Sequence, residues 1–213
     1  MRKLKGMLLI LLLVVMLVVM AGCGKSKKTS NKSETNSTLV IDENNCLIVV
    51  YEEDFKEDYY DKKELEKFID SELAEFNETY AADKSNGVVK ESFSVKDSKA
   101  VLKLKFSSYQ DYMNYSADYV DSTRNARLFI GTYDEAVNAG YSFEETFQSA
   151  DGKEGFNVLD VKDDEKVFIL FTNEKYKIEV NGEILGMNGN VKIENKLAVT
   201  SDKQENFIIY KQK

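Results

Sequence analysis

Short runs of apolar residues separated by polar turns predict β-strands early in the chain. Residues 38–41 and 46–51 are rich in β-branched side chains, and the polar segment 42–45 between them predicts a hairpin. Residues 88–96 and 100–106 predict a second hairpin. Along 100–106, apolar side chains alternate with lysines, so one side of this strand should face a core and the other side water.

The clearest helical periodicity follows Asp61. Apolar residues recur there every three or four positions on one face, and lysine and glutamate occupy the other face. The apolar face consists of Leu65, Phe68, Ile69, Leu73, Phe76 and Tyr80. Asp61, with Glu64 three residues later, forms a capping-box pattern, so we expect a helix over about residues 62–81.

Two shorter helices are expected further along the chain. Four tyrosines with spacings of three, three and four residues predict a helix over residues 108–120 that carries them on one face. Thr132 and Glu135 form another capping box, which opens a short helix that Gly140 ends. Residues 142–145 repeat the capping-box pattern directly.

The last third of the chain has the period-two pattern of strands. Residues 167–171 form an apolar run, and Asn181-Gly182 between two alternating runs is a strong hairpin signal. Other strands are expected at residues 128–131, 191–194, 196–200 and 207–210. The chain therefore predicts an α+β fold, in which N-terminal β-hairpins with an amphipathic helix and shorter helices precede a C-terminal antiparallel β-meander.

The N-terminus has the order of an export signal. Arg2, Lys3 and Lys5 precede the apolar run 7–20, which fits a signal-peptide core and is short for a membrane span of about 20 residues. Small residues then lead to Cys23. The alternative is an uncleaved signal anchor with an incidental cysteine, and the order of charge, core and small residues favours the cleaved signal.

The segment Met20-Ala21-Gly22-Cys23 resembles the lipobox of bacterial lipoproteins, with Met20 where that family prefers leucine. The resemblance implies a diacylglycerol thioether on Cys23 and cleavage just before it. Two or three acyl chains would then hold the protein stably on the extracytoplasmic face of the cell membrane.

We therefore divide the chain into three parts. Residues 1–22 are the signal peptide, and residues 23–37 are the lipidated cysteine with a flexible tether rich in lysine and serine. Residues 38–213 are the folded region, with 38–150 and 156–213 as two sub-units within it if it divides. One compact unit is favoured.

Charge is distributed unevenly between these parts. The chain has 29 basic and 37 acidic residues, of which three basic residues lie in 1–22 and four lysines and one glutamate lie in the tether. Residues 38–213 therefore carry 22 basic and 36 acidic residues, a net charge of −14. This charge repels phosphate backbones, so we expect no nucleic-acid partner. Anionic lipids attract the tether and repel the body, so the body should stand off from the membrane.

The second cysteine, Cys46, has no intrachain partner if Cys23 is acylated. Cys46 begins an apolar run, which indicates a small buried residue in a strand. A reactive thiol is the other interpretation, and it would need a neighbouring base to lower its pKa. Because the chain has no histidine, we favour the buried residue.

The tyrosine stripe and an arginine pair are the candidate ligand-binding residues. They are Tyr109, Tyr112, Tyr115, Tyr119, Arg124 and Arg127. The tyrosines would stack sugars or a partner's aromatic residues, or would simply pack on the sheet, which we favour. The two guanidiniums would clamp a carboxylate or phosphate, or would make ordinary surface ion pairs, which we also favour.

The sequence lacks the residues that several kinds of catalytic and metal site require. Without histidine there is no His-dependent triad, no His metal site and no imidazole acid–base catalysis. Nucleophile-elbow, Walker A, dinucleotide-binding and Cys-x-x-Cys patterns are also missing from the sequence. The acidic runs 52–54 and 160–165 do not fit a calcium loop, which needs glycine for its turn. We expect no catalytic residue, no metal and no cofactor.

Much of the region 38–213 resembles an uncharacterised group of lipoproteins from Gram-positive, mainly clostridial, bacteria. The resemblance is carried by the segments STLVIDE, VYEEDFKEDYYDKKELEKFI, LKFSSYQDYMNY, IGTYDEAVNAGYSFEETF, VNGEILGMNGNVKI and FIIYK. It implies an exported lipoprotein without an assigned activity, and it transfers no functional residue.

Two functional hypotheses follow. The first is a non-catalytic binding or interaction module of the cell envelope, anchored through Cys23, with a protein or envelope partner; it expects an exposed aromatic or strand-edge surface. A purely scaffolding protein is not separable from it by sequence. The second is an envelope hydrolase that uses paired carboxylates, with two acids converging in a cleft and at least one shifted pKa.

Overall fold

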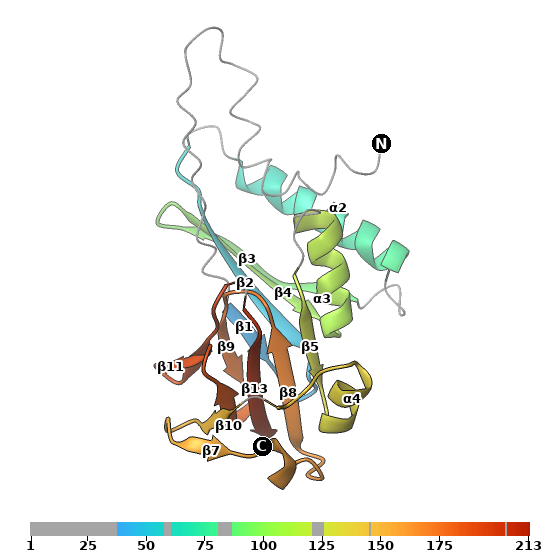
Figure 1. Ribbon diagram of the computed structural model, residues 1–213. Helices are drawn as coiled ribbons and strands as arrows, with labels where there is room; N and C mark the ends of the chain where they lie inside the picture. The colour runs from blue at the N-terminus through green and yellow to red at the C-terminus, as the bar shows by residue number, and fades with distance from the viewer. Residues whose placement is uncertain (1–37, 58–60, 81–86, 121–125, 145, 203) are drawn as a thin grey trace, which may run out of the picture.

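The computed structural model describes residues 38–57, 61–80, 87–120, 126–144, 146–202 and 204–213. These residues form two mostly antiparallel β-sheets and three α-helices (Figure 1), which confirms the predicted α+β class and the β-rich C-terminal part. The predicted signal peptide, Cys23, the tether and Arg124 lie outside the described residues. Within the described part, no helix has both the length and the apolar character needed to cross a membrane.

The larger sheet has seven strands and contains both predicted N-terminal hairpins. In spatial order its strands are β11 (Lys192–Glu194), β12 (Leu197–Val199), β9 (Lys177–Val180), β1 (Thr38–Ile41), β2 (Leu47–Asp54), β4 (Lys99–Phe106) and β3 (Val88–Lys96). All neighbours are antiparallel except β1 and β9, which are parallel. Asp97 and Ser98 join β3 to β4 with positive φ at both positions, as a two-residue type I′ turn requires.

The smaller sheet has six strands, all antiparallel to their neighbours. In spatial order they are β5 (Leu128–Gly131), β8 (Val167–Thr172), β13 (Asn206–Gln212), β10 (Gly182–Asn188), β6 (Phe147–Ser149) and β7 (Glu154–Phe156). Both sheets contain strands from the ranges 38–150 and 156–213, so these two ranges share one body.

The hairpin predicted at Asn181-Gly182 is wrong. β9 before it belongs to the seven-stranded sheet, and β10 after it belongs to the six-stranded sheet. The N–H of Asn181 donates to the carbonyl of Ile41 at 3.0 Å, which extends the pairing of β9 with β1. A Cβ on Gly182 would lie 2.0 Å from the carbonyl oxygen of Lys211 in β13. Glycine is therefore required here by the close approach of another strand and not by a turn.

Helix α2 (Lys62–Tyr80) begins where the sequence predicted and packs against β3 (Figure 1). Its N-terminus is capped by Asp61, whose Oδ1 accepts from the N–H groups of Lys63 at 2.7 Å and Glu64 at 3.1 Å. Near its other end, the buried Asn77 amide bonds to both the N–H and the C=O of Val88, each at 2.8 Å. Both backbone groups of Val88, the first residue of the edge strand β3, are thus occupied, so that another strand cannot pair with them.

The helix predicted over residues 108–120 consists of an α-helical segment followed by a π-helical segment. Ser108 caps α3 (Tyr109–Tyr115) by accepting from the N–H of Asp111, and a π-helical segment, η2 (Ser116–Val120), continues it. α4 (Tyr133–Asn138) carries the predicted capping box of Thr132 and Glu135 in full. Gly140 follows with φ +88°, as expected of a residue that ends a helix.

The repeated capping pattern at 142–145 does not start a helix: residues 142–144 have no helical structure, and residue 145 lies outside the described residues. The reason is the side chain of Phe143, whose ring lies 5.3 Å from that of Tyr133 and 5.7 Å from that of Phe207. Packing of this ring on the sheet outweighs the local capping preference. A short 3-10 turn, η3 (Val158–Asp160), lies further along.

The six-stranded sheet separates two apolar cores. One core joins both sheets with α2 and α3, and includes Leu39, Phe76 and Leu170. The other lies on the opposite face of the six-stranded sheet and includes Phe171 and Phe207, covered by α4 and by the segment that follows it. Leu170 and Phe171 are consecutive residues in different cores, because side chains alternate across a strand.

Candidate functional site

The tyrosine stripe faces the interior. Tyr112, Tyr115 and Tyr119 are 2%, 1% and 8% exposed, and Tyr109 is half-buried with its ring 5.5 Å from that of Phe129. The hydroxyls of Tyr112 and Tyr176 share a hydrogen bond of 2.7 Å. The geometry therefore supports the packing interpretation, since three of the four rings are buried and the fourth, Tyr109, packs against Phe129.

Of the two candidate arginines, the structure describes only Arg127. Its guanidinium carbon lies 4.7 Å from the ring centre of Phe171 and 5.7 Å from that of Tyr141. One of its nitrogens lies 3.5 Å from a carboxylate oxygen of Glu205, and both side chains are exposed. Arg127 thus covers the edge of the second core and forms an ordinary surface ion pair. Arg124 lies outside the described residues.

Cys46 lies in the turn before β2 and is half-buried. Its Sγ lies 3.7 Å from the carbonyl oxygen of Ser107, to which it donates. Burial and the nearby carboxylate of Asp42 raise the pKa of the Cys46 thiol, while Lys105 opposes this. A raised pKa is the opposite of what a reactive thiolate needs, so the geometry supports a structural role.

Helix α2 carries a buried carboxyl, Glu72, that was not predicted from the sequence. Glu72 was assigned with the other glutamates to the polar face, but it is 6% exposed. It receives a hydrogen bond of 2.5 Å from the hydroxyl of Tyr115. The spacing contained the signal, because Glu72 follows Ile69 by three residues and precedes Phe76 by four, which places it on the apolar face.

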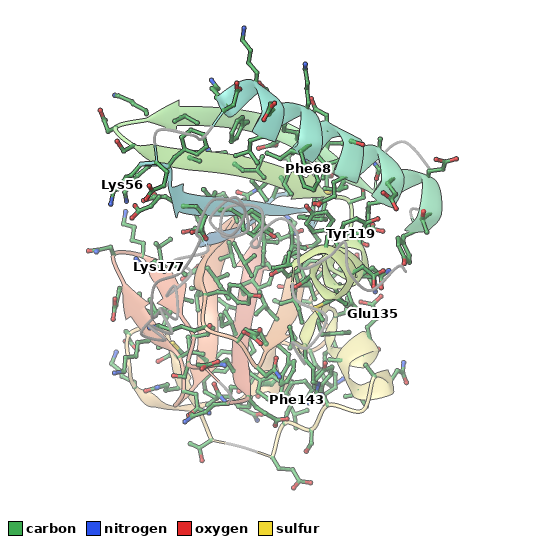
Figure 2. The ribbon with its side chains drawn as sticks, turned by 90° about the horizontal axis from the view of Figure 1, so that it is seen from above. Lys56, Phe68, Tyr119, Glu135, Phe143 and Lys177 are labelled. Atoms are coloured by element: carbon green, nitrogen blue, oxygen red, sulfur yellow. The ribbon has the colours of Figure 1, made fainter. Side chains whose placement is uncertain are left out.

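Burial raises the pKa of Glu72 to about 7; the hydrogen bond from Tyr115 lowers it, and the charge of Glu75 raises it further. Burial and the nearby acids, Glu75 first, also raise the pKa of Tyr119 to about 12. Figure 2 shows Tyr119 beneath α2. The environment of Glu72 is thus aromatic and acidic, which favours the neutral carboxyl.

An open groove lies at the α4 end of the molecule. Three segments line it: Tyr133 and Val137 from α4, residues 141–144, and residues 157–159. Its volume is about 340 Å³, at the lower end of the range of ligand pockets. Figure 2 shows Phe143 and Glu135 at this end, away from Lys56 and Lys177.

The groove has an aromatic floor and aliphatic rims. Phe143 packs between Tyr133 and the rings of the second core, and so joins the floor to the sheet. Val137 on one rim is 46% exposed, and Leu159 on another is 54% exposed. The Asn157 side chain caps the turn by accepting from the N–H of Leu159 at 3.0 Å, which fixes the course of that rim. The groove therefore presents apolar side chains to solvent beside a larger polar part of its lining.

Polar residues also line the groove. They are Ser142, Glu144 and Asn157, of which Asn157 already accepts from the N–H of Leu159 through its side chain. Among the described residues, no group of three or more Cys, Asp or Glu side chains is arranged to hold a metal ion. The arrangement can bury apolar side chains of a ligand and can hydrogen-bond its backbone, but it brings together no nucleophile with a base.

Comparison with protein-family models, with curated proteins and with solved structures finds no match to this chain. The protein is a two-sheet α+β protein with a groove lined by aromatic residues at one end.

Proposed function

We propose that this protein is a lipoprotein of the cell envelope, held through Cys23 on the extracytoplasmic face of the membrane, whose folded body is a non-catalytic binding module. The groove beside α4 is its binding site, and its ligand is a peptide or protein segment. The lipobox-like order of residues 20–23 supports the anchor, and the lining of the groove supports the binding role.

The observation that carries the binding role is the exposure of Val137 and Leu159 on the rims of an aromatic groove. Burial of apolar surface stabilises by about 25 cal/mol per Å², so two exposed aliphatic side chains around one concave site offer binding free energy to a ligand. A ligand that covers them recovers this free energy.

Hydrolysis by paired carboxylates has weaker support. Glu72 meets the requirement for a shifted pKa, but it lies in the core with Tyr115 hydrogen-bonded to it. Glu75, the acid that acts on it electrostatically, is exposed on the same helix. A pair of catalytic carboxyls must face a common cleft in which a bond can be placed between them.

Panning of a phage-displayed library of random decapeptides against the purified full-length chain tests the groove. We expect enriched peptides that bind the wild type and lose about tenfold in affinity for the double variant Val137→Ser, Leu159→Ser, since the variant removes the exposed aliphatic side chains on both rims. Both positions are half exposed, so the fold should tolerate the substitutions.

The matched control is Val89→Ser. Val89 is 45% exposed on β3, in the other sheet and away from the groove. Its substitution should leave peptide affinity unchanged. Peptides that bind the groove variant as well as the wild type, or a failure to enrich any peptide, would count against the proposed binding role.

The anchor is tested separately with Cys23→Ala in cells that export the protein. Labelled palmitate should be incorporated into the wild type and not into the variant, and the mature wild-type chain should start at Cys23 by mass spectrometry. A wild-type chain that keeps residues 1–22 and takes up no label would instead be held by an uncleaved signal anchor.

A further inference from the structure

We propose that the groove binds an extended peptide in which basic residues alternate with apolar ones, paired by its backbone along residues 142–144. This inference rests on the proposed function of the groove and names its ligand chemistry. Three features of the groove support it: the free backbone of one wall, the alternation of side chains along that wall, and the charge of the segments around it.

The backbone of residues 142–144 is available for pairing. The preceding Tyr141 donates its N–H to the carbonyl of Ala136 at 3.0 Å. For Ser142, Phe143 and Glu144, no backbone hydrogen bond connects either the N–H or the C=O to another residue within the described ranges. Backbone groups that are left to water can exchange it for the backbone of an added strand, which is a common mode of peptide recognition.

Side chains along this wall alternate as they do in a strand. Tyr141 and Phe143 are half-buried against the second core, whereas Ser142 and Glu144 are exposed. A peptide paired with such a wall has its own side chains in the same alternation. Every second side chain then lies over the aromatic floor between Val137 and Leu159, and the others point to solvent.

The groove is surrounded mainly by negative charge. Residues 133–144 and 157–163 carry five acids and one cation, Lys162; the acids are Asp134, Glu135, Glu144, Asp160 and Asp163. Glu135 is engaged in its capping box, and Asp163 is paired with Lys162 at 2.7 Å. Lys162 also interacts electrostatically with Asp134, which leaves Glu144 and Asp160 as exposed carboxylates with no ion pair to a described residue. This field attracts basic side chains and repels acidic ones.

The test uses the full-length chain in detergent and three fluorescein-labelled heptapeptides. The first alternates lysine with phenylalanine and leucine, the second has glutamate in place of every lysine, and the third is the first with alternate backbone amides methylated. Fluorescence anisotropy reports the Kd of each. We expect the basic peptide to bind, the acidic peptide to bind at least about tenfold more weakly, and the methylated peptide to lose about tenfold.

Substitutions in the protein separate the contribution of charge from that of apolar contact. Glu144→Lys should weaken the basic peptide and strengthen the acidic one by about threefold each, and added salt should reduce this difference because the charges are exposed. Leu159→Ser should weaken both peptides, and Val89→Ser should weaken neither.

Three results would overturn the inference. They are equal affinity for the basic and acidic peptides, an unchanged Kd on methylation, and no binding of the basic peptide. Equal affinity that still falls in Leu159→Ser would leave the proposed function in place and remove only the charge preference. If the groove variant also fails to reduce the affinity of peptides selected by panning, the proposed function fails as well.

Discussion

Glu72 is an ionisable residue that lies buried in the core of the protein. Its carboxyl is 6% exposed, among Tyr115, Tyr119 and Phe76, and so has lost its hydration. The one hydrogen bond from Tyr115 compensates only part of the lost hydration free energy. The acids that act on this cluster electrostatically, Glu75 and Asp118, have the same sign as an ionised Glu72. The folded protein therefore holds a proton on Glu72 more tightly than the unfolded chain does.

This predicts a stability that falls as pH rises. The pKa of Glu72 is about 7 in the folded state and 4.5 in the reference state, so its favourable contribution is complete below pH 4.5 and is lost as pH rises through 7. The difference corresponds to about 3 kcal/mol. Glu72→Gln, which stays neutral, should match the wild type below pH 4.5 and be more stable by up to about 3 kcal/mol above pH 7.

Urea unfolding followed by circular dichroism, at several pH values from 4 to 8, measures this difference. Glu78→Gln is the control, because Glu78 is exposed on the same helix. A stability difference between Glu72→Gln and the wild type that stays constant over this range would show that Glu72 has no raised pKa in the folded protein.

Among the elements, the junction between β9 and β10 decides the topology. Its sequence, Asn-Gly between alternating runs, satisfies every local rule for a hairpin. The chain instead passes from one sheet to the other, because β9 pairs with β1 and β12, and β10 pairs with β13 and β6. Partners far away in the sequence thus override the local turn preference.

Alanine substitutions at Gly182, in this junction, and at Gly189, further along the chain, should change the stability of the protein by different amounts. In Gly182→Ala the new Cβ would meet the carbonyl of Lys211 at 2.0 Å, so β10 and β13 must separate locally, and we expect a loss of stability of about 1–3 kcal/mol. Gly189 has no atom within 4 Å of the corresponding position and no positive φ, so Gly189→Ala should be nearly neutral.

Both variants can be compared by chemical unfolding at one pH. Similar stability of Gly182→Ala and the wild type would mean that β13 does not approach the backbone at Gly182, and the crossing between sheets would then need another explanation.

At the scale of the whole molecule, strands from the two ends of the chain complete each other's sheets. β1, the first described strand, lies between β2 and β9. β5, from the middle of the chain, has β8 as its strand neighbour. Removal of residues after 150 would leave β5 and β6 without β8 and β10, and would uncover the main core beside β1.

We therefore expect residues 38–150 and 156–213 to be unable to fold separately. Each fragment, expressed alone, should lack a cooperative thermal transition by circular dichroism and a dispersed amide spectrum by NMR, since each would expose half of a shared core. Residues 38–213 together should show both. A fragment that melts cooperatively on its own would demonstrate two domains.

Local features of the sequence were sufficient for most elements. The second hairpin, the start of α2 and the capping box of α4 were predicted at or within a residue of their observed bounds, and the first hairpin was predicted except that β2 runs three residues further, to Asp54. Each depends on groups close together in the chain: a polar turn between β-branched runs, or a side chain that caps N–H groups two or three residues away. For the tyrosine face, packing on the sheet was the favoured prediction, and the burial of Tyr112, Tyr115 and Tyr119 agrees with it; the groove beside α4 was not predicted, because its segments are brought together only by the fold.

The amino-acid sequence by itself determined the α+β class, the acidic body and the lipobox-like N-terminus, because these are properties of composition, periodicity and short-range order. Only the tertiary structure decided which sheet β10 joins, that Glu72 is buried, and that α4, residues 141–144 and residues 157–159 enclose a groove. Each of these depends on atoms brought together from distant parts of the chain, such as Gly182 with Lys211 and Glu72 with Tyr115. The free energy of those contacts is set by burial and close packing, which no local pattern specifies.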